Sequence, residues 1–282
     1  LAALEAAHAG DMDAAVLLGG NLYEATPESA WAEAALDRVP FKLFLTTTLN
    51  RGHVHGVESG EVIVLPVCAR DEEPEPTTQE SMFNYVRLSD GGIERIASVR
   101  SEVSILADLG TRLFPKGPVD FAAFRRHRTV REAIAKVVPG LEPLEHIDVA
   151  RREFHIRGRV LHEPTFATMD GRAHFAIPDE APSVTNGSWP FTLVTLRSEG
   201  QFNSIVYEGR DSYRDTDDRW VLFVNAEDAD ALGVAEGDAV DMASETGEMR
   251  ALRARIFDVP RGTVAAYYPE ANVLTTRATD AR

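Results

Sequence analysis

Residues 192–203 read TLVTLRSEGQFN, and this stretch decides the fold of the C-terminal part of the chain. An apolar strand runs straight into arginine, serine, glutamate, glycine, glutamine and asparagine. A rigid element therefore delivers hydrogen-bond donors, an acceptor and a flexible backbone position to one place. Residues 263–272 repeat the arrangement, because a strand-like run to Tyr268 breaks into a polar turn that ends at Asn272. The pattern predicts a binding site for a large polar ligand.

Together these stretches resemble the C-terminal dinucleotide-binding domain of molybdopterin oxidoreductases, which hold molybdenum or tungsten on two pterin dinucleotides. Residues 225–238 read N-x-x-D-x-x-x-L-G-x-x-x-G-D, a pattern that is similar to one in the same domain and whose residues cap a helix and form turns. The resemblance implies a double-psi β-barrel over residues 189–282. Apolar residues alternate with period two in this region around a single short helix, which independently favours a small β-barrel.

The resemblance also assigns the ligand-binding residues of this domain. Residues that would line the dinucleotide and the pterin are Thr195, Arg197, Ser198, Glu199, Gly200 and Gln201. Tyr268 and Asn272 would close over the cofactor. The role of Arg197 stays open between a phosphate contact, a contact with a pterin carbonyl, and an ion pair with Glu199.

Residues 1–115 alternate strands and helices, which predicts a Rossmann-like domain with a mainly parallel sheet. Strands are expected at 14–18, 41–45 and 61–67, and a helix capped by Thr26, with Pro27 at its first position, is expected to reach about Arg38. Ligands of such sheets lie beyond the carboxyl ends of the strands. The candidate residues at these ends are Gly19, Gly20, Asn21, Thr46, Thr47 and Thr48. A plain βα turn is the alternative reading of the Gly-Gly-Asn loop.

The segment that follows these strands resembles the third domain of molybdopterin oxidoreductases. An apolar strand ending in Leu-Pro precedes an acidic loop at 71–76 and a polar hairpin from 81, for which residues 90–92 supply the turn. Residues 48–53 look closest to the formate-dehydrogenase-like branch of the family. A helix at 101–110 has apolar residues at helical spacing and is expected to pack in the core. His53 and His55 are interpreted as ordinary loop histidines, because no third metal ligand is near them.

Residues 116–188 are expected to connect the two domains with helical and irregular segments. Helices are predicted within 121–138, a strand pair within 166–177 and a linker at 178–187. The arginines at positions 125, 126, 128 and 131 could clamp a phosphate, although a solvated face that pairs with acidic residues is favoured.

The composition excludes several classes of function. Asp and Glu number 45 against 29 Lys and Arg, a formal charge of −16, which argues against nucleic-acid and anionic-membrane partners. Cys68 is the single cysteine, so a four-cysteine metal site is excluded, and its place after an apolar run indicates a buried, inert thiol. No apolar run is long enough for membrane insertion, and the sequence shows no secretory signal, which predicts a cytoplasmic protein.

The resemblance therefore predicts the C-terminal half of a molybdopterin oxidoreductase that binds molybdopterin guanine dinucleotide with molybdenum or tungsten. Its partners would be the missing N-terminal half of the same chain and an electron-transfer protein that the sequence does not identify. The metal-ligating residue and any iron–sulfur ligands would lie in that N-terminal half, so this fragment should catalyse nothing alone. The alternative is a non-catalytic binding module. An NAD-linked enzyme ranks low, because the loop at 19–21 lacks the pattern G-x-G-x-x-G.

Overall fold

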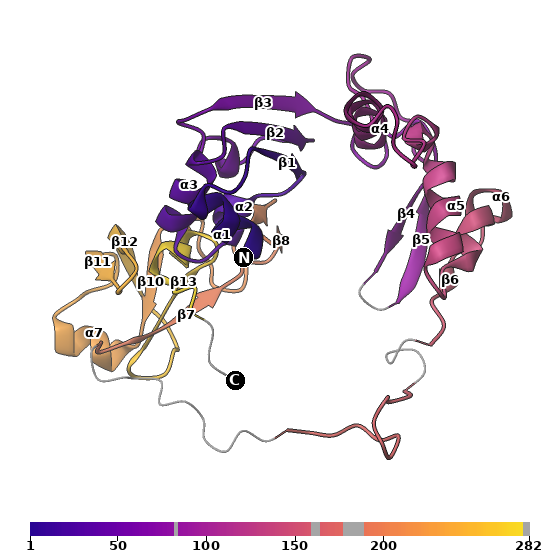
Figure 1. Cartoon of the computed structure of the whole chain (residues 1–282). Coiled ribbons are helices and arrows are strands. Elements are labelled where there is room, and N and C mark those ends of the chain that lie inside the picture. Colours follow the sequence, from indigo (N-terminus) through magenta and orange to yellow (C-terminus); the bar gives the residue numbers. More distant parts are fainter. Residues whose placement is uncertain (82–83, 159–163, 177–188, 279–282) are drawn as a thin grey trace. The chain divides into compact units, whose positions relative to one another are not determined.

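The computed structural model describes residues 1–81, 84–158, 164–176 and 189–278 (Figure 1). The chain divides into two compact units. The first comprises residues 1–44, 49–64 and 178–282, and the second comprises residues 45–48 and 65–177. Each unit is described by itself below. The domain limits at residues 115 and 188 stay predictions.

A three-stranded sheet and three helices form the N-terminal part of the first unit. The strands lie in the order β1 (Ala14–Leu18), β2 (Phe41–Thr46) and β3 (Glu61–Pro66), and their arrows point the same way in Figure 1. The helices are α1 (Ala2–Ala9), α2 (Leu22–Ala25) and α3 (Ser29–Asp37), followed by a short 3₁₀ helix at Arg51–His53. Leu4 of α1 packs with Ala32 and Leu36 of α3 in one apolar cluster. The predicted strands and the parallel sheet are confirmed.

The helix after the Gly-Gly-Asn loop begins later than the sequence predicts. Thr26 does not cap it, because its hydroxyl donates to Leu22 O at 2.7 Å and thereby ends the short helix α2. The longer helix, α3, begins at Ser29 after Glu28. The left-handed backbone of Glu28, with φ 53°, interrupts the helical conformation between α2 and α3. The prediction that Pro27 starts the helix is therefore wrong.

A five-stranded mixed sheet forms the C-terminal part of the first unit. Its order is β11-β12-β10-β13-β7, with parallel pairing of β10 to β12 and of β13 to β7. The strands are β7 (Thr192–Leu196), β10 (Val221–Val224), β11 (Ala239–Ala243), β12 (Glu248–Ile256) and β13 (Thr263–Tyr267). A separate hairpin joins β8 (Gln201–Phe202) to β9 (Ile205–Val206), and a 3₁₀ helix covers Glu270–Leu274.

The helix of the C-terminal part lies where its capping residues predict. Helix α7 (Ala226–Leu232) begins after Asn225, whose side chain accepts a hydrogen bond from the N–H of Glu227. It ends at Gly233, which takes the left-handed conformation with φ 68°. The N-cap and C-cap predicted from the sequence pattern are both confirmed.

The second unit contains an antiparallel sheet and several helices. Its strands are β4 (Thr77–Glu80), β5 (Tyr85–Ser89) and β6 (Phe154–His155). Its helices are α4 (Glu102–Leu113), α5 (His127–Val137) and α6 (Ile147–Ala150), with 3₁₀ helices at Ala123–Arg125 and Glu142–His146. Val86, Leu144 and Ile147 lie in its apolar core. The predicted helix from 101 is confirmed as α4.

Two predictions for the second unit are wrong. In the hairpin of β4 and β5, Thr77 pairs with Ser89 and Glu80 pairs with Val86, and the N–H of Asn84 donates to Ser81 O, so residues 90–92 do not form its turn. Gly92 instead follows β5 and donates to Glu73 O at 2.7 Å. In the described part of 166–177, namely 166–176, a turn closes at Gly171 but the residues form no strand pair. The linker predicted at 178–187 lies outside the described residues.

None of the helices in the described ranges combines the length and the apolar character that crossing a bilayer requires.

Candidate functional site

The two polar loops of the C-terminal domain leave the sheet side by side. Strands β7 and β13 pair in parallel, with Leu196 opposite Tyr267 at their carboxyl ends. The N–H of Tyr268 donates to Leu196 O at 2.8 Å, which extends this pairing by one residue. The loops that follow the two strands therefore start at the same edge of the sheet, although 71 residues separate Leu196 from Tyr267 in the chain.

Gln201 joins the two loops through its side-chain amide. Its Nε2 donates to Asn203 O at 2.8 Å within its own loop and to Tyr268 O at 2.7 Å in the other. Its Oε1 accepts from the N–H of Ser198 at 3.0 Å. A further hydrogen bond connects the loops, because the hydroxyl of Tyr268 donates to Asn203 Oδ1 at 2.9 Å. The loops thus form one polar structure.

Arg219, two residues before β10, connects the same two loops. It donates from Nη1 to Ser198 Oγ at 2.8 Å and from Nη2 to Tyr268 O at 2.6 Å. Its Nε and Nη2 also donate to the carboxylate of Glu270 at 2.6 and 2.9 Å. Arg219 is not among the candidate site residues that the sequence suggested. A charged residue at the edge of a buried strand was the available signal.

Asp211 stabilises the first loop through hydrogen bonds to its carboxylate. Its carboxylate accepts from the hydroxyl of Tyr267 at 2.6 Å, from Nη1 of Arg214 at 2.7 Å and from the N–H of Tyr213 at 3.1 Å. Burial by itself would raise the pKa of Asp211, but these hydrogen bonds hold that pKa below its ordinary value. Burial and the nearby Asp211 carboxylate raise the pKa of Tyr267. Asp211 is therefore a buried anion that Arg214 compensates.

Arg197 lies exposed at the start of the first loop. Its guanidinium carbon lies 4.9 Å from the centre of the Tyr268 ring, a cation–π geometry. It forms no ion pair with another residue in the described ranges, and the carboxylate of Glu199 instead accepts a hydrogen bond from Ser212. Of the three roles that the sequence left open, the ion pair with Glu199 is thus absent among the described residues. Arg197 is a cation available to an anionic ligand.

Gly200 and Thr195 complete the predicted set in this domain. Gly200 has φ 66°, and a Cβ there would lie 3.1 Å from Cγ of Glu208, so the turn favours glycine for both reasons. Thr195 is exposed on β7, where it pairs with Ala266 of β13.

Comparison with known proteins identifies this region. Residues 191–282 match the Molydopterin dinucleotide binding domain family.

Over residues 191–282 the chain is therefore similar to this domain family.

Named relatives extend the similarity beyond the molydopterin dinucleotide binding domain. An uncharacterized oxidoreductase of Mycobacterium tuberculosis is 35% identical over 295 residues, which cover 97% of this chain and 37% of that protein. The protein YdeP of Escherichia coli is 24% identical over 299 residues, which cover 98% of this chain and 38% of that protein. The chain therefore spans less than two fifths of the length of these relatives. The resemblance to molybdopterin oxidoreductases that the loops suggested is confirmed.

A solved structure shares the fold. Acetylene hydratase from Pelobacter acetylenicus superposes with a TM-score of 0.61 at 15% identity, over 95% of this chain and 40% of the hydratase. At this identity the likeness concerns the fold alone.

The Gly-Gly-Asn loop of the N-terminal part lies against the second loop of the dinucleotide-binding domain. Asn21 is buried and caps α2 by accepting from the N–H of Glu24 at 3.1 Å, while its amide donates to the Glu24 carboxylate. Asn272, also buried, donates through Nδ2 to Glu24 O. The N–H of Glu28 donates to Asn272 O at 2.9 Å. Asn272 thus fastens the domain to α2, and the predicted loops at 19–21 and 272 are brought together.

The surroundings of Glu24 are polar and partly charged. Burial raises the pKa of Glu24, and this rise is opposed by Arg51, whose Nη1 lies 3.4 Å from Oε1, and by the hydrogen bond from Asn21. Gly52 packs closely here, because a Cβ on it would lie 2.6 Å from Asn21 Oδ1. Gly19 takes φ 54°, and Gly20 beside it is exposed.

The threonines predicted at the end of β2 lie in the second unit. Thr46 is buried and its hydroxyl donates to Thr48 O at 2.7 Å, whereas Thr47 and Thr48 are exposed. Their assignment to the ligand stays a prediction, as does that of the other residues named from the sequence.

The histidines and arginines that the sequence singled out have protein partners. His53 Nδ1 accepts from the N–H of Asn50 at 3.0 Å, and His55 stacks on Tyr23. Arginines 125, 126, 128 and 131 each contact a carboxylate, as the favoured interpretation expects, although the last of them is buried and does not lie on a solvated face. Cys68 is only partly buried, which corrects the expectation of a buried thiol. Its partial burial and the nearby Glu73 raise the pKa of Cys68, which favours the less reactive thiol form. Among the described residues, no group of three or more His, Cys, Asp or Glu side chains is arranged to hold a metal ion.

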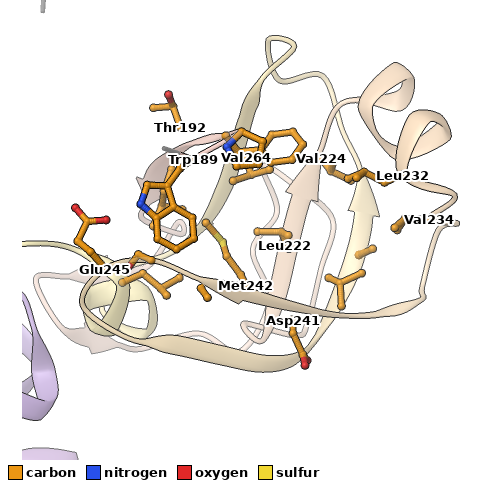
Figure 2. A pocket seen from close by; sticks show the side chains of 18 of the residues that line it. Trp189, Thr192, Leu222, Val224, Leu232, Val234, Asp241, Met242, Glu245 and Val264 are labelled. Carbon is orange, nitrogen blue, oxygen red and sulfur yellow. The ribbon is translucent and has the colours of Figure 1, made fainter. Parts of the chain in front are cut away.

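A second feature of the dinucleotide-binding domain is an apolar cavity of about 880 Å³ (Figure 2). It lies between the edge strands β7 and β11 of the mixed sheet, and Figure 2 shows Trp189, Leu222 and Met242 around it. Among the described residues, the charged side chains that line it are Asp241 and Glu245, and none is a lysine or an arginine. Its lining residues include Leu274 and Thr276 after β13, but none from 197–203 or 268–272.

Proposed function

We propose that this chain is the C-terminal part of a molybdenum or tungsten oxidoreductase that binds a bis(pterin guanine dinucleotide) cofactor and resembles formate dehydrogenases. The observation that carries the proposal is the match of residues 191–282 to the dinucleotide-binding family, within which the two polar loops meet at one edge of the sheet. The curated relatives named as oxidoreductases support the reaction class.

We further propose that the mixed sheet belongs to a double-psi β-barrel. The strand order β11-β12-β10-β13-β7 combines two parallel pairs with two antiparallel ones, which a simple meander does not produce. This mixture supports the barrel that the sequence resemblance implies.

The residues of the loops fit an anionic, hydrogen-bonding ligand. Arg197 offers an exposed guanidinium without a carboxylate partner in the described ranges, and such a group binds phosphate oxygens in a bidentate way. The ring of Tyr268 beside it provides an apolar face with a polar end. Gly200 keeps the backbone of the loop free of a Cβ. These groups are suited to a pyrophosphate and a heterocycle.

The cofactor, when bound, would supply the oxygen-atom or hydride chemistry, and the protein would fix its position and restrict access to it. Arg197 would neutralise phosphate charge, and the backbone around Glu199 and Gly200 would set how closely the ligand approaches. The metal-ligating residue would lie in the remainder of the longer protein.

We propose that this remainder, the N-terminal part of the same protein, packs against the N-terminal sheet. Parallel sheets in α/β proteins are usually covered on both faces. Here Val16 and Leu18 of β1 are 44% and 48% exposed, and Val64 of β3 is 37% exposed. The relatives, of which this chain covers 37%, are long enough to supply such a cover.

Nucleotide binding tests the cofactor assignment. GDP serves as a probe for the guanine nucleotide end, and calorimetric titration of the 282-residue chain measures its Kd. We expect GDP to bind and CDP to bind about tenfold more weakly, a ratio that corresponds to roughly 1.4 kcal/mol. Equal affinity for the two nucleotides would contradict the guanine assignment, and absence of binding to both would contradict the dinucleotide site.

The reaction class requires the complete protein. We expect it to contain molybdenum or tungsten by elemental analysis and to oxidise formate with an artificial electron acceptor. Metal and guanine nucleotide without formate oxidation would refute the formate-dehydrogenase likeness while leaving the cofactor assignment standing.

A further inference from the structure

The side chain of Gln201 has no hydrogen-bonding capacity left for a ligand. A primary amide has two N–H donors and one acceptor oxygen. Both donors of Gln201 are used, one on Asn203 O and one on Tyr268 O. Its oxygen accepts from the N–H of Ser198 at 3.0 Å and lies 3.3 Å from both Ser198 Oγ and Arg219 Nη2. Gln201 therefore faces the protein although it lies in a loop expected to hold the cofactor.

Arg219 is committed to the same network. It contacts Ser198 in the first loop and both Tyr268 O and Glu270 in the second, at distances of 2.6 to 2.9 Å. Its guanidinium also lies over the ring of Tyr267, 4.5 Å from the centre. The side chains of Arg219 and Glu270 are 18% and 16% exposed, so solvent screens their ion pair little. A planar fork of donors can join several acceptors at once, which a lysine ammonium does not reproduce.

We propose that Arg219 and Gln201 are positioning residues for the dinucleotide site. They fix residues 197–203 against residues 268–272 before the ligand arrives and do not contact it, while Arg197 and the loop backbone do. This assignment rests on the proposed function, because it takes these loops to be the cofactor loops. Loops ordered in advance cost less to order on binding, which raises affinity without adding a contact.

The test measures loop order and ligand affinity in the same variants of the 282-residue chain. Arg219→Met removes the fork, and Arg219→Lys keeps the charge. Arg255→Met is the matched control, since Arg255 is a partly exposed arginine, 27% accessible, that pairs with Glu236 and donates to Asp215 O, partners that lie outside residues 197–203 and 268–272. Hydrogen–deuterium exchange of the ligand-free chain reports loop order, calorimetry with GDP reports affinity, and the melting temperature reports global stability.

We expect Arg219→Met to speed exchange within 197–203 and 268–272 and to weaken GDP binding about tenfold, the factor for one lost charge-assisted hydrogen bond. Arg219→Lys should restore part of both, because it can reach some of the acceptors but not bridge all of them. Arg255→Met should match the wild type in exchange and in affinity.

Three results would overturn the proposal. Unchanged hydrogen–deuterium exchange and unchanged GDP affinity in Arg219→Met would show that Arg219 does not position the two loops. Weaker GDP binding with unchanged exchange would make Arg219 a direct ligand contact. If Arg219→Met and a second variant, Glu270→Gln, both lower the melting temperature of the whole chain by a similar amount, the network is part of the core. A wild-type chain that fails to bind GDP counts against the proposed function, and the exchange result then decides the positioning claim alone.

Discussion

Strand β7 borders two very different regions of the dinucleotide-binding domain. After its carboxyl end, residues 197–203 form a polar loop that meets residues 268–272 through hydrogen bonds. At its amino end, Thr192 and Leu193 line the apolar cavity of about 880 Å³. The cavity has a sizeable volume, yet its charged lining residues are two carboxylates, which would repel a pyrophosphate. Chemistry, and not volume, identifies the end of the strand that suits an anionic ligand.

The polar end depends on a buried charge pair, and this gives the largest expected effect. We expect Asp211→Ala to lower the free energy of unfolding by about 3 kcal/mol, because Arg214 and the Tyr267 hydroxyl lose a buried partner. Urea denaturation measures the change. Asp215→Ala, which removes an exposed pair with Arg210, should cost less than about 1 kcal/mol. Equal losses in the two variants would refute the special role of Asp211.

The two regions should also respond differently to added volume. Ala265 and Ala254 are both fully buried, but Ala265 packs with Phe223 and Tyr267 whereas Ala254 lines the cavity. We expect Ala265→Val to cost about 2 kcal/mol through overpacking. Ala254→Val should cost less than about 1 kcal/mol, since space is present beside it. Thermal denaturation of both variants makes the comparison, and a costlier Ala254→Val would show that the hollow is filled in solution.

Ligand binding should depend on the polar end alone. Arg197→Met is expected to weaken GDP binding about tenfold, because it removes an unpaired cation. Arg250→Met removes another exposed arginine, which pairs with Glu248 on β12, and should leave the Kd unchanged. Met242→Leu, a conservative change in the cavity, should also leave it unchanged. Loss of affinity in the cavity variant would place the ligand at the wrong end of β7.

The smallest effect is a pH dependence that arises from Asp211. The pKa of Asp211 is lower in the folded chain than in the unfolded chain. The pKa of an aspartate in an unfolded chain is about 3.9. The stability it contributes is therefore complete above the unfolded pKa and is lost as the pH falls through the folded pKa. The gap in unfolding free energy between wild type and Asp211→Asn should be larger at pH 7 than at the acid end of the folded range. A gap that does not change with pH would contradict the lowered pKa.

Sequence reasoning succeeded where local signals act alone. Asn225 and Gly233 bound α7 as predicted, because caps depend on neighbouring backbone groups. The loop after Leu196 and the polar turn that ends at Asn272 were expected to lie together, and the parallel pairing of β7 with β13 brings them to one edge of the sheet. Their assignment to a ligand stays a prediction.

It failed where a distant partner decides the local structure. Thr26 has the features of an N-cap, yet it ends α2, and Glu28, which directly precedes α3, is held by Asn272 and by Arg277. Arg219 belongs to the site because loops far away in the sequence present acceptors to it. Neither relation leaves a periodicity or a motif in the chain.

The bond between Asn272 and Glu24 has a consequence for synthesis on the ribosome. The two residues are 248 positions apart, so at 5 to 20 residues per second the partner of Glu24 is made roughly 12 to 50 s later. During that interval the turn between α2 and α3 lacks the acceptors that hold the N–H of Glu28. The N-terminal segment of the nascent chain therefore stays incompletely folded during this interval. Chaperone binding would matter most in the same interval.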